Sequence, residues 1–186
     1  MMLEYHMAQL LGTIKATFLD VPDRFAALLK DIDPAIANTW RLKLLEKPIG
    51  IRIANAQGAS GVPLLVVTPM GSTIANDFMN DALSVDVKGF VENQRVDVLV
   101  MTSSAEEGIC LEELVKAILL VSDKKLFDVY DSFSFEGMAA PSMELEALAM
   151  SKGIHVRSLQ FAAVYTMQVR RIDSDPVRDL EVTGHA

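Results

Sequence analysis

Apolar residues in the first 45 positions recur every three or four residues, the spacing of helices that bury one face. Three helices are predicted here, separated by Val21-Pro22 and by Asp33-Pro34. We expect Asp23 and Asp33 to cap the second and third helices, with Pro34 in the first turn. The three buried stripes comprise Leu3, Met7, Leu10, Leu11, Ile14 and Phe18, then Phe25, Leu28 and Leu29, then Ile36, Trp40, Leu44 and Leu45.

From Lys47-Pro48 onward, short runs of alternating or continuous apolar residues replace the helical spacing. Residues 49–53 predict a strand, and residues 63–68 predict a buried strand that a turn at Pro69–Ser72 would close. An antiparallel hairpin is predicted by two runs of alternating valines, Val85 and Val87, then Val96, Val98 and Val100, with Glu92–Gln94 as the connection between them.

The second half of the chain begins with a strong helix signal. Ser103 and Ser104 each precede a glutamate by three residues, the spacing of a capping box. The helix that follows carries an apolar stripe through Leu119. Further along, residues 126–135 predict a strand, residues 137–141 a loop, and residues 143–150 a short helix that Gly153 ends.

Residues 154–172 alternate apolar and polar side chains over a stretch much longer than a usual strand of about six residues. A bulge, a bend or an extension beyond the sheet is therefore expected. The whole pattern predicts one α+β domain over residues 1–172, with a twisted, mainly antiparallel sheet flanked by helices. Residues 1–46 form its helical segment, residues 47–172 its sheet and helices, and residues 173–186 a polar C-terminal arm.

Composition narrows the classes of function. With 51% hydrophobic and 23% charged residues among 186, the chain can bury a core without disulfides or metals. A net charge of −8 opposes binding to phosphate backbones, so sequence-specific nucleic-acid binding is not expected. No signal sequence and no apolar run of about 18 residues is apparent, so neither secretion nor membrane binding is expected. The ten methionines are scattered, which favours core packing.

Candidate chemistry is sparse. His6, His155 and His185 are far apart and lack the spacing of metal ligands. Cys110 is the single cysteine, which favours a reducing compartment, and its apolar neighbours favour a packed thiol over a nucleophile. The pair Asp31 and Asp33 offers too few oxygen ligands for a metal ion.

Three further segments favour turns or loops over binding sites. Asp173 and Asp175 form a second acidic pair too small to hold a metal ion. The glycines of Asn55–Gly61 lack a phosphate-binding spacing, and Pro69–Ser72 suits a plain turn. No catalytic, cofactor-binding or metal-ligating residue is therefore predicted, and the chain is not expected to be an enzyme.

The order of elements from residue 60 to residue 172 resembles the tail-terminator and neck (head-to-tail connector) proteins of tailed bacteriophages. The resemblance rests on the strand Arg95–Val100, the helix with Leu111, Leu114, Val115, Ile118 and Leu119, the pair Leu145 and Leu148, and the strand Gly153–Phe161 with Tyr165.

That resemblance implies a subunit without catalytic activity that forms a ring, often a hexamer, between the tail tube and the head. The implied partners are copies of the same chain and the tube, sheath and connector proteins. The implied location is the virion tail or neck, assembled in the host cytoplasm. DNA passes through such a ring without being read, and an acidic lumen suits that passage. The long final strand and the arm would then contact neighbouring subunits.

Two other interpretations remain open from the residues. The first is a cytosolic α/β domain that binds or converts a small molecule at the loops Asn55–Gly61 and Pro69–Ser72. The second is a tail-sheath or baseplate adaptor from the same kind of particle. A shift in melting temperature on ligand binding would favour the first, and position in an assembled particle would identify the second.

Overall fold

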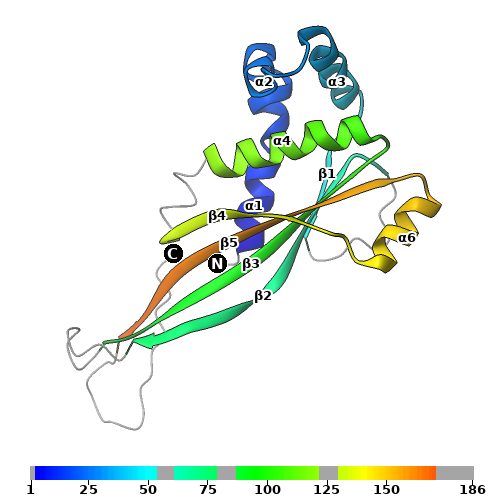
Figure 1. Cartoon of the computed structure of the whole chain (residues 1–186). Coiled ribbons are helices and arrows are strands. Elements are labelled where there is room, and N and C mark those ends of the chain that lie inside the picture. Colours follow the sequence, from blue (N-terminus) through cyan, green and yellow to red (C-terminus); the bar gives the residue numbers. More distant parts are fainter. Residues whose placement is uncertain (1–2, 54–60, 79–86, 122–129, 171–186) are drawn as a thin grey trace.

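The computed structural model describes residues 3–53, 61–78, 87–121 and 130–170, and begins with a layer of helices (Figure 1). The N-terminal helices are α1 (Leu3–Leu11), the π-helical turn η1 (Lys15–Leu19), α2 (Pro22–Leu28) and α3 (Pro34–Glu46). The predicted helical segment is confirmed, although the first helix changes to a π-helical turn after Leu11.

The two predicted aspartate caps have different outcomes. Asp33 caps α3, because its Oδ1 accepts hydrogen bonds from the amides of Ala35 at 2.9 Å and Ile36 at 3.4 Å. The prediction for Asp23 is wrong. Pro22 already occupies the first turn of α2, so Val21 takes the cap position and Asp23 lies inside the helix.

The strands form one five-stranded sheet in the order β1-β2-β3-β5-β4. Among the strands that the structure describes, β1 and β2 run parallel and the other pairs are antiparallel. This mainly antiparallel sheet with flanking helices confirms the predicted α+β class. The strands are β1 (Gly50–Ile53), β2 (Leu64–Phe78), β3 (Val87–Thr102), β4 (Ser132–Ala139) and β5 (His155–Arg170).

Several predicted strand boundaries are wrong because polar residues continue the strands. Pro69–Ser72 is not a turn, since β2 runs through it with a bulge between Pro69 and Gly71. Glu92–Gln94 is not a connection, since it lies in the middle of β3. The predicted loop at residues 137–141 begins later, because β4 continues to Ala139 after a bulge next to Gly137.

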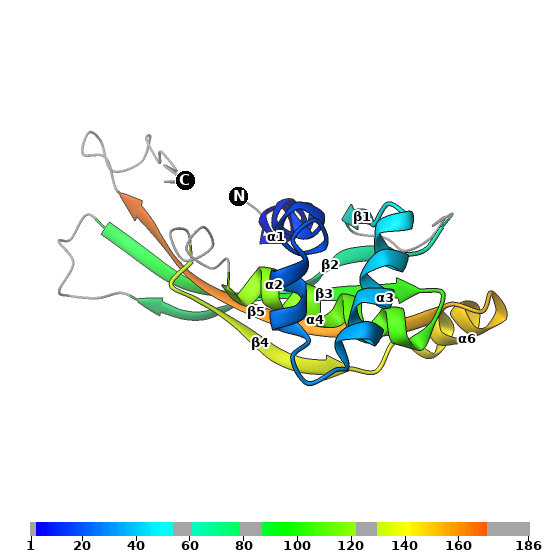
Figure 2. The ribbon, with the colours of Figure 1, turned by 90° about the horizontal axis from the view of Figure 1, so that it is seen from above.

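The helices cover one face of the sheet. Figure 2 shows α1, α2, α3 and α4 (Ala105–Val121) on the same side of the sheet, with α6 (Met143–Ser151) at one end of it. The capping box of α4 is confirmed, because Ser104 Oγ accepts from the Glu107 amide and Glu107 Oε2 accepts from the Ser103 amide. The core between helices and sheet includes Leu3, Met7, Leu11, Phe25, Leu44, Leu65, Val67, Val96, Val98, Val100, Leu111, Leu114, Ile118, Leu159 and Phe161.

A smaller apolar cluster lies on the other face of the sheet. Leu64 and Val66 alternate with the core residues Leu65 and Val67, so they point away from the helices. They pack with Met101. In the described part of the chain, no helix is long and apolar enough to cross a membrane.

Candidate functional site

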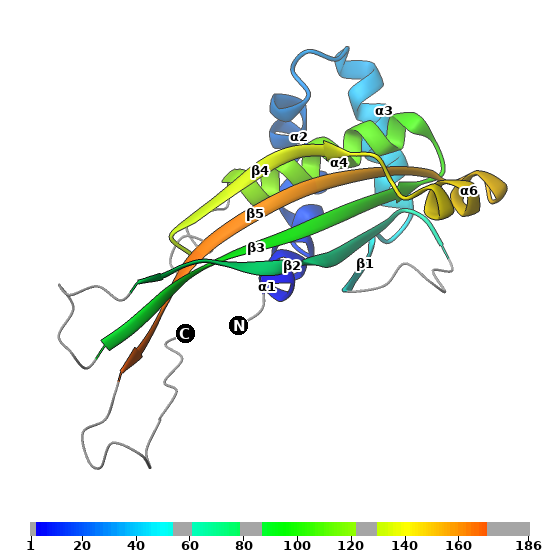
Figure 3. The same ribbon diagram turned by 60° about the horizontal axis from the view of Figure 1, so that its bottom comes forward.

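Three strands run on past the helices and form a projecting ribbon (Figure 3). We define the ribbon as Gly71–Phe78 of β2, Val87–Arg95 of β3 and Ala162–Arg170 of β5, which pair side by side. β1 accompanies β2 only as far as Val67. The ribbon explains the unusual length of the last predicted strand, which extends beyond the helix-covered sheet in unbroken register with β3.

Beyond Val67 of β2 and beyond Val164 of β5, the two edges of the ribbon lack a partner strand within the described residues. On one side β1 stops at Val67 of β2, and on the other side the pairing of β4 with β5 ends at Ser132 and Val164. Such edges present backbone donors and acceptors that can pair with another chain. Met70, just before the ribbon, and Ile74 within it are exposed apolar residues on the β2 side.

A carboxylate joins all three strands at the base of the ribbon. Glu92 of β3 accepts hydrogen bonds from Ser72 of β2 and from the hydroxyl of Tyr165 of β5, and from the side chain of Gln94. Burial alone would raise the pKa of Glu92, but these hydrogen bonds outweigh it and lower the pKa. The ionised form therefore stabilises the ribbon where it leaves the core.

An edge-to-face chain of aromatic rings connects this base to helix α1. The ring of His6 lies 6.0 Å from that of Tyr130, which lies 6.1 Å from that of Tyr165. Burial, and next the carboxylate of Glu4, raise the pKa of Tyr130 to about 12. The Tyr130 hydroxyl and His6 Nδ1 are buried and find no hydrogen-bond partner among the described residues. The ring contacts, not hydrogen bonds of these atoms, therefore link α1 to the ribbon at this point.

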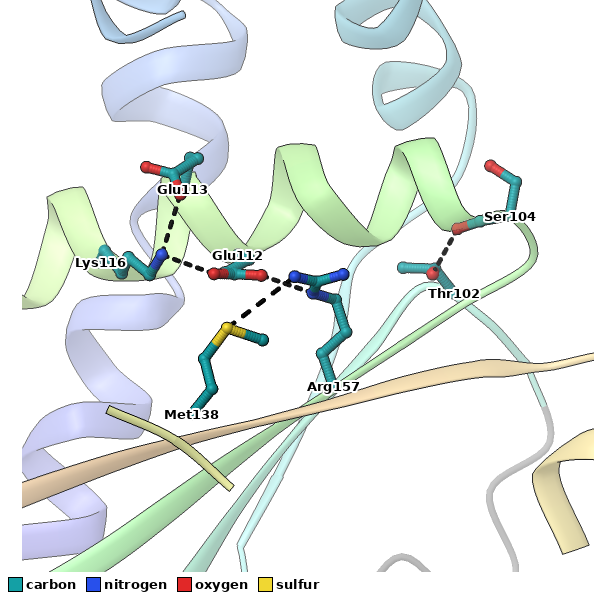
Figure 4. A network of polar contacts seen from close by, with 7 residues as sticks. All are labelled: Thr102, Ser104, Glu112, Glu113, Lys116, Met138 and Arg157. Atoms are coloured by element: carbon teal, nitrogen blue, oxygen red, sulfur yellow. Dashed lines mark hydrogen bonds and ion pairs between the residues drawn. The ribbon is translucent and has the colours of Figure 1, made fainter. Parts of the chain in front are cut away.

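A charge network joins α4 to the sheet (Figure 4). Glu112 of α4 is only 3% exposed, and its two carboxylate oxygens each lie 2.5 Å from a cation, the Nε of Arg157 on β5 and the Nζ of Lys116. Arg157 also contacts the sulfur of Met138 on β4 at 3.9 Å. The two cations offset the free energy that it costs to remove the Glu112 carboxylate from water.

The partners of Lys116 complete this network. Its ammonium also binds Glu113 at 2.9 Å and lies 5.5 Å from the centre of the Phe135 ring. Burial would lower the pKa of Lys116, but Glu112 and Glu113 outweigh it and raise the pKa. Every charge in the network is therefore engaged within the fold, and the arrangement holds α4 onto the sheet.

Cys110 is buried in the core, as its position on the stripe of α4 predicts. Burial, more than the carboxylates of Glu107 and Glu113, raises the pKa of its thiol to about 12. The thiolate is the nucleophilic form, so a thiol with this pKa is unreactive at neutral pH. The predicted packed cysteine is confirmed.

The other predicted candidates do not come together. His6 lies on α1 and the exposed His155 begins β5, while His185 and the pair Asp173 and Asp175 lie outside the described residues. Across the described ranges, no group of three or more histidine, cysteine or carboxylate side chains is placed to hold a metal ion. Of the loop Asn55–Gly61, only Gly61 is described, and the segment Pro69–Ser72 belongs to β2.

A pocket of about 380 Å³ lies beside β1 at the edge of the sheet. Its lining is apolar at Pro48, Ile51, Val62 and Leu64 and basic at Lys47 and Arg52. This pocket was not predicted, because its two halves come from separate segments that meet through the parallel pairing of β1 and β2.

The ribbon and its base were also missed from the sequence. Two signals were available: the unusual length of β5, and its parity, which puts Tyr165 on the same face as the core residues Phe161 and Ala163. No protein-family model and no curated protein matches this chain. Its function has therefore to be inferred from its own fold and surfaces.

Proposed function

We propose that this chain is a structural virion protein of a tailed bacteriophage, a ring-forming tail terminator or neck subunit that joins the tail tube to the head connector. The observation that carries the proposal is the projecting ribbon, whose two edges are unpaired within the described residues beyond Val67 of β2 and Val164 of β5. An isolated soluble domain gains nothing from such edges, which favour aggregation, whereas an assembly subunit can use them to pair with partners.

Two further features support an assembly role. A sheet flanked by helices is what the resemblance to the phage subunits implies, and this chain has that arrangement. The polar networks, in contrast, offer no reactive group, because Glu112, Lys116 and Arg157 neutralise one another and Cys110 is buried. Ser72, which the small-molecule hypothesis placed in a binding loop, instead bonds Glu92 inside the ribbon base.

The test is to measure the mass of the purified chain by light scattering after size exclusion, image it in negative stain, and add isolated tail tubes. We expect closed rings that bind tube ends. The variant Met70→Lys/Ile74→Lys places charges on the β2 side of the ribbon and its approach, and it should stay folded but lose tube binding. Ile36→Lys, on the exposed side of α3, is the matched control and should bind normally. A chain that stays monomeric with tubes and at high concentration would contradict the proposal.

A further inference from the structure

Beyond Val67, the outer edge of β2 has no partner strand among the described residues. β1 pairs with β2 from Leu64 to Val67 and ends there, which leaves the stretch from Thr68 to Phe78 uncovered in this part of the chain. An edge of this kind presents backbone donors and acceptors that another strand can bind. We call the stretch Thr68–Phe78 the free edge.

The free edge carries little of the protection that keeps sheet edges apart. Charged side chains are one such protection, yet the first charged residue after Thr68 is Asp77, close to the far end. Met70 and Ile74 instead expose apolar side chains, which are 57% and 63% accessible to solvent. Met70 thus departs from the core packing predicted for the methionines. The free edge therefore combines open backbone groups with apolar side chains that a second strand would cover.

The register between β2 and β3 makes the free edge symmetric about Thr73. On each side of Thr73, the edge holds four residues paired with β3 and one bulge residue, which is Met70 on one side and Ala75 on the other. A second free edge can therefore lie antiparallel to the first with the two Thr73 residues opposite each other. In this alignment the edges match end to end, with Thr68 opposite Phe78 of the other copy.

The same alignment brings compatible side chains together. Ser72 and Ile74 lie on one face of the ribbon, because they pair with Gln94 and Glu92, which are two residues apart in β3. Each Ser72 then faces Ile74 of the other copy on that face. Thr73 lies on the opposite face and meets its own counterpart, and threonine pairs across antiparallel strands are favourable.

Like charges and collisions are also avoided. Asp77 of each copy lies opposite Pro69 of the other, so the two Asp77 residues stay at opposite ends of the contact. β1 covers β2 only up to Val67, and the second free edge ends with Phe78 opposite Thr68, so it stops where β1 begins. The ribbon projects away from the helices (Figure 3), and antiparallel pairing therefore places the two helix layers at opposite ends of the pair.

The size of the contact sets how strongly it holds. At about 3.4 Å per residue the free edge is about 37 Å long, and a sheet is about 10 Å deep. The contact then buries roughly 400 Å² on each copy, about half of the ~800 Å² that each partner buries in a stable interface. We therefore expect a reversible dimer whose fraction rises with protein concentration.

We propose that the free edges of two copies of this chain pair antiparallel about a two-fold axis at Thr73, which joins the two ribbons into one continuous sheet. This contact goes beyond the proposed function and does not require it. Because the β2 side of the ribbon is also the side expected to bind a tube, a paired subunit has to separate before it meets one. Combined with ring contacts elsewhere, a two-fold contact joins two rings to each other.

Disulfide cross-linking tests the position of the axis, because the native Cys110 is buried and contributes no surface thiol. Thr73→Cys places two thiols directly opposite each other, with Cα atoms about 5 Å apart and within reach of a disulfide. Ile74→Cys, at the next exposed position, places them on a diagonal of about 8 Å, which is too far.

After mild oxidation, we expect Thr73→Cys to form a covalent dimer at least ten-fold faster than Ile74→Cys, as read on a denaturing gel without reductant. Equal rates, a faster reaction of Ile74→Cys, or no dimer from either variant would overturn the proposed alignment.

A charge exchange tests the contact without cross-linking. Thr73→Lys and Thr73→Glu each place like charges opposite each other on the axis, so each variant alone should dimerise at least ten-fold more weakly in sedimentation equilibrium. An equimolar mixture of the two should recover the dimer, because opposite charges then meet. Ile36→Lys, at an exposed position on α3, is the control and should dimerise as the unmodified chain does. Normal dimerisation of the single variants, or no recovery in the mixture, would overturn the contact.

The outcomes separate this contact from the proposed function. Covalent dimers of Thr73→Cys without rings or tube binding would support the contact and overturn the virion role. Rings that bind tubes without such dimers would overturn the contact alone. The absence of dimers, rings and tube binding would overturn both.

Discussion

The Nε of Arg157 on β5 lies 2.5 Å from Oε2 of Glu112 on α4, although 45 residues separate the two along the chain. The carboxylate is almost fully buried, whereas the guanidinium is partly exposed. This pair, with Lys116, is the main polar link that the described residues show between α4 and the sheet.

Replacing Glu112 should be costly. Glu112→Ala leaves Arg157 and Lys116 facing each other without their shared carboxylate. We expect the free energy of unfolding to fall by about 2 kcal/mol. This loss is smaller than for a fully buried ion pair, because both cations are partly exposed. Glu113→Ala is the matched control, since it binds the same Lys116 from an exposed position and should cost under about 0.5 kcal/mol. Urea unfolding measures both, and equal losses would contradict this role of Glu112.

The thiol of Cys110 should resist modification. Because its pKa is raised to about 12 and the side chain is buried, a thiol reagent at pH 7.5 should react only as fast as the chain unfolds. Ile109→Cys, one position away on the exposed side of α4, should react at once and serves as the control. Fast labelling of the native chain at Cys110 would disagree with this packing.

The tyrosines give a pH dependence at alkaline pH. The pKa values of Tyr130 and Tyr165 are raised from 10.0 to about 12 in the folded chain, for Tyr165 by burial and then by the hydrogen bond to Glu92. The unfolded chain therefore loses these protons first, so the stabilisation is complete below pH 10 and is lost as pH rises through 12. Unfolding measured between pH 9 and 12 should show this loss, and Tyr165→Phe should weaken it. A flat profile would contradict the assignment.

Gly71 should be difficult to replace. It takes a φ of +116° beside the bulge in β2, a conformation that side chains rarely adopt. Gly71→Ala should lower the free energy of unfolding by about 1–3 kcal/mol. Thr73→Ala, in the same strand with no such constraint, should cost less than about 1 kcal/mol. The comparison is made by thermal unfolding, and similar costs for both would show that the backbone there is not strained.

Local signals in the sequence predicted local structure well. The serine and glutamate spacing before α4 and Asp33-Pro34 before α3 are confirmed, because capping depends on residues three or four positions apart. Glu92–Gln94 was predicted as a connection between strands, because a run of polar residues usually marks a turn in a sheet that helices cover. In the ribbon they form a strand, since the burial that creates an alternating pattern is absent beyond the helix layer.

The candidate surfaces could not be predicted for a different reason. Glu92 and Tyr165 meet across two strands, and Lys47 and Leu64 meet only once β1 pairs with β2. Their side chains carry no pattern in the sequence, because each depends on the register between distant segments. The methionines Met143 and Met150 of α6 can be read directly from the sequence. Their exposure could not be predicted, because it depends on how the helix packs on β5.

The unbroken register between β3 and β5 has a mechanical consequence. Sixteen consecutive residue pairs, from Val87 with Arg170 to Thr102 with His155, join these strands without a shift. The hydrogen bonds between antiparallel strands lie across the strand direction. A pull along the strands therefore loads the whole ladder in shear, and the bonds share the force instead of opening one after another. The long axis of this subunit is the direction in which it best bears tension.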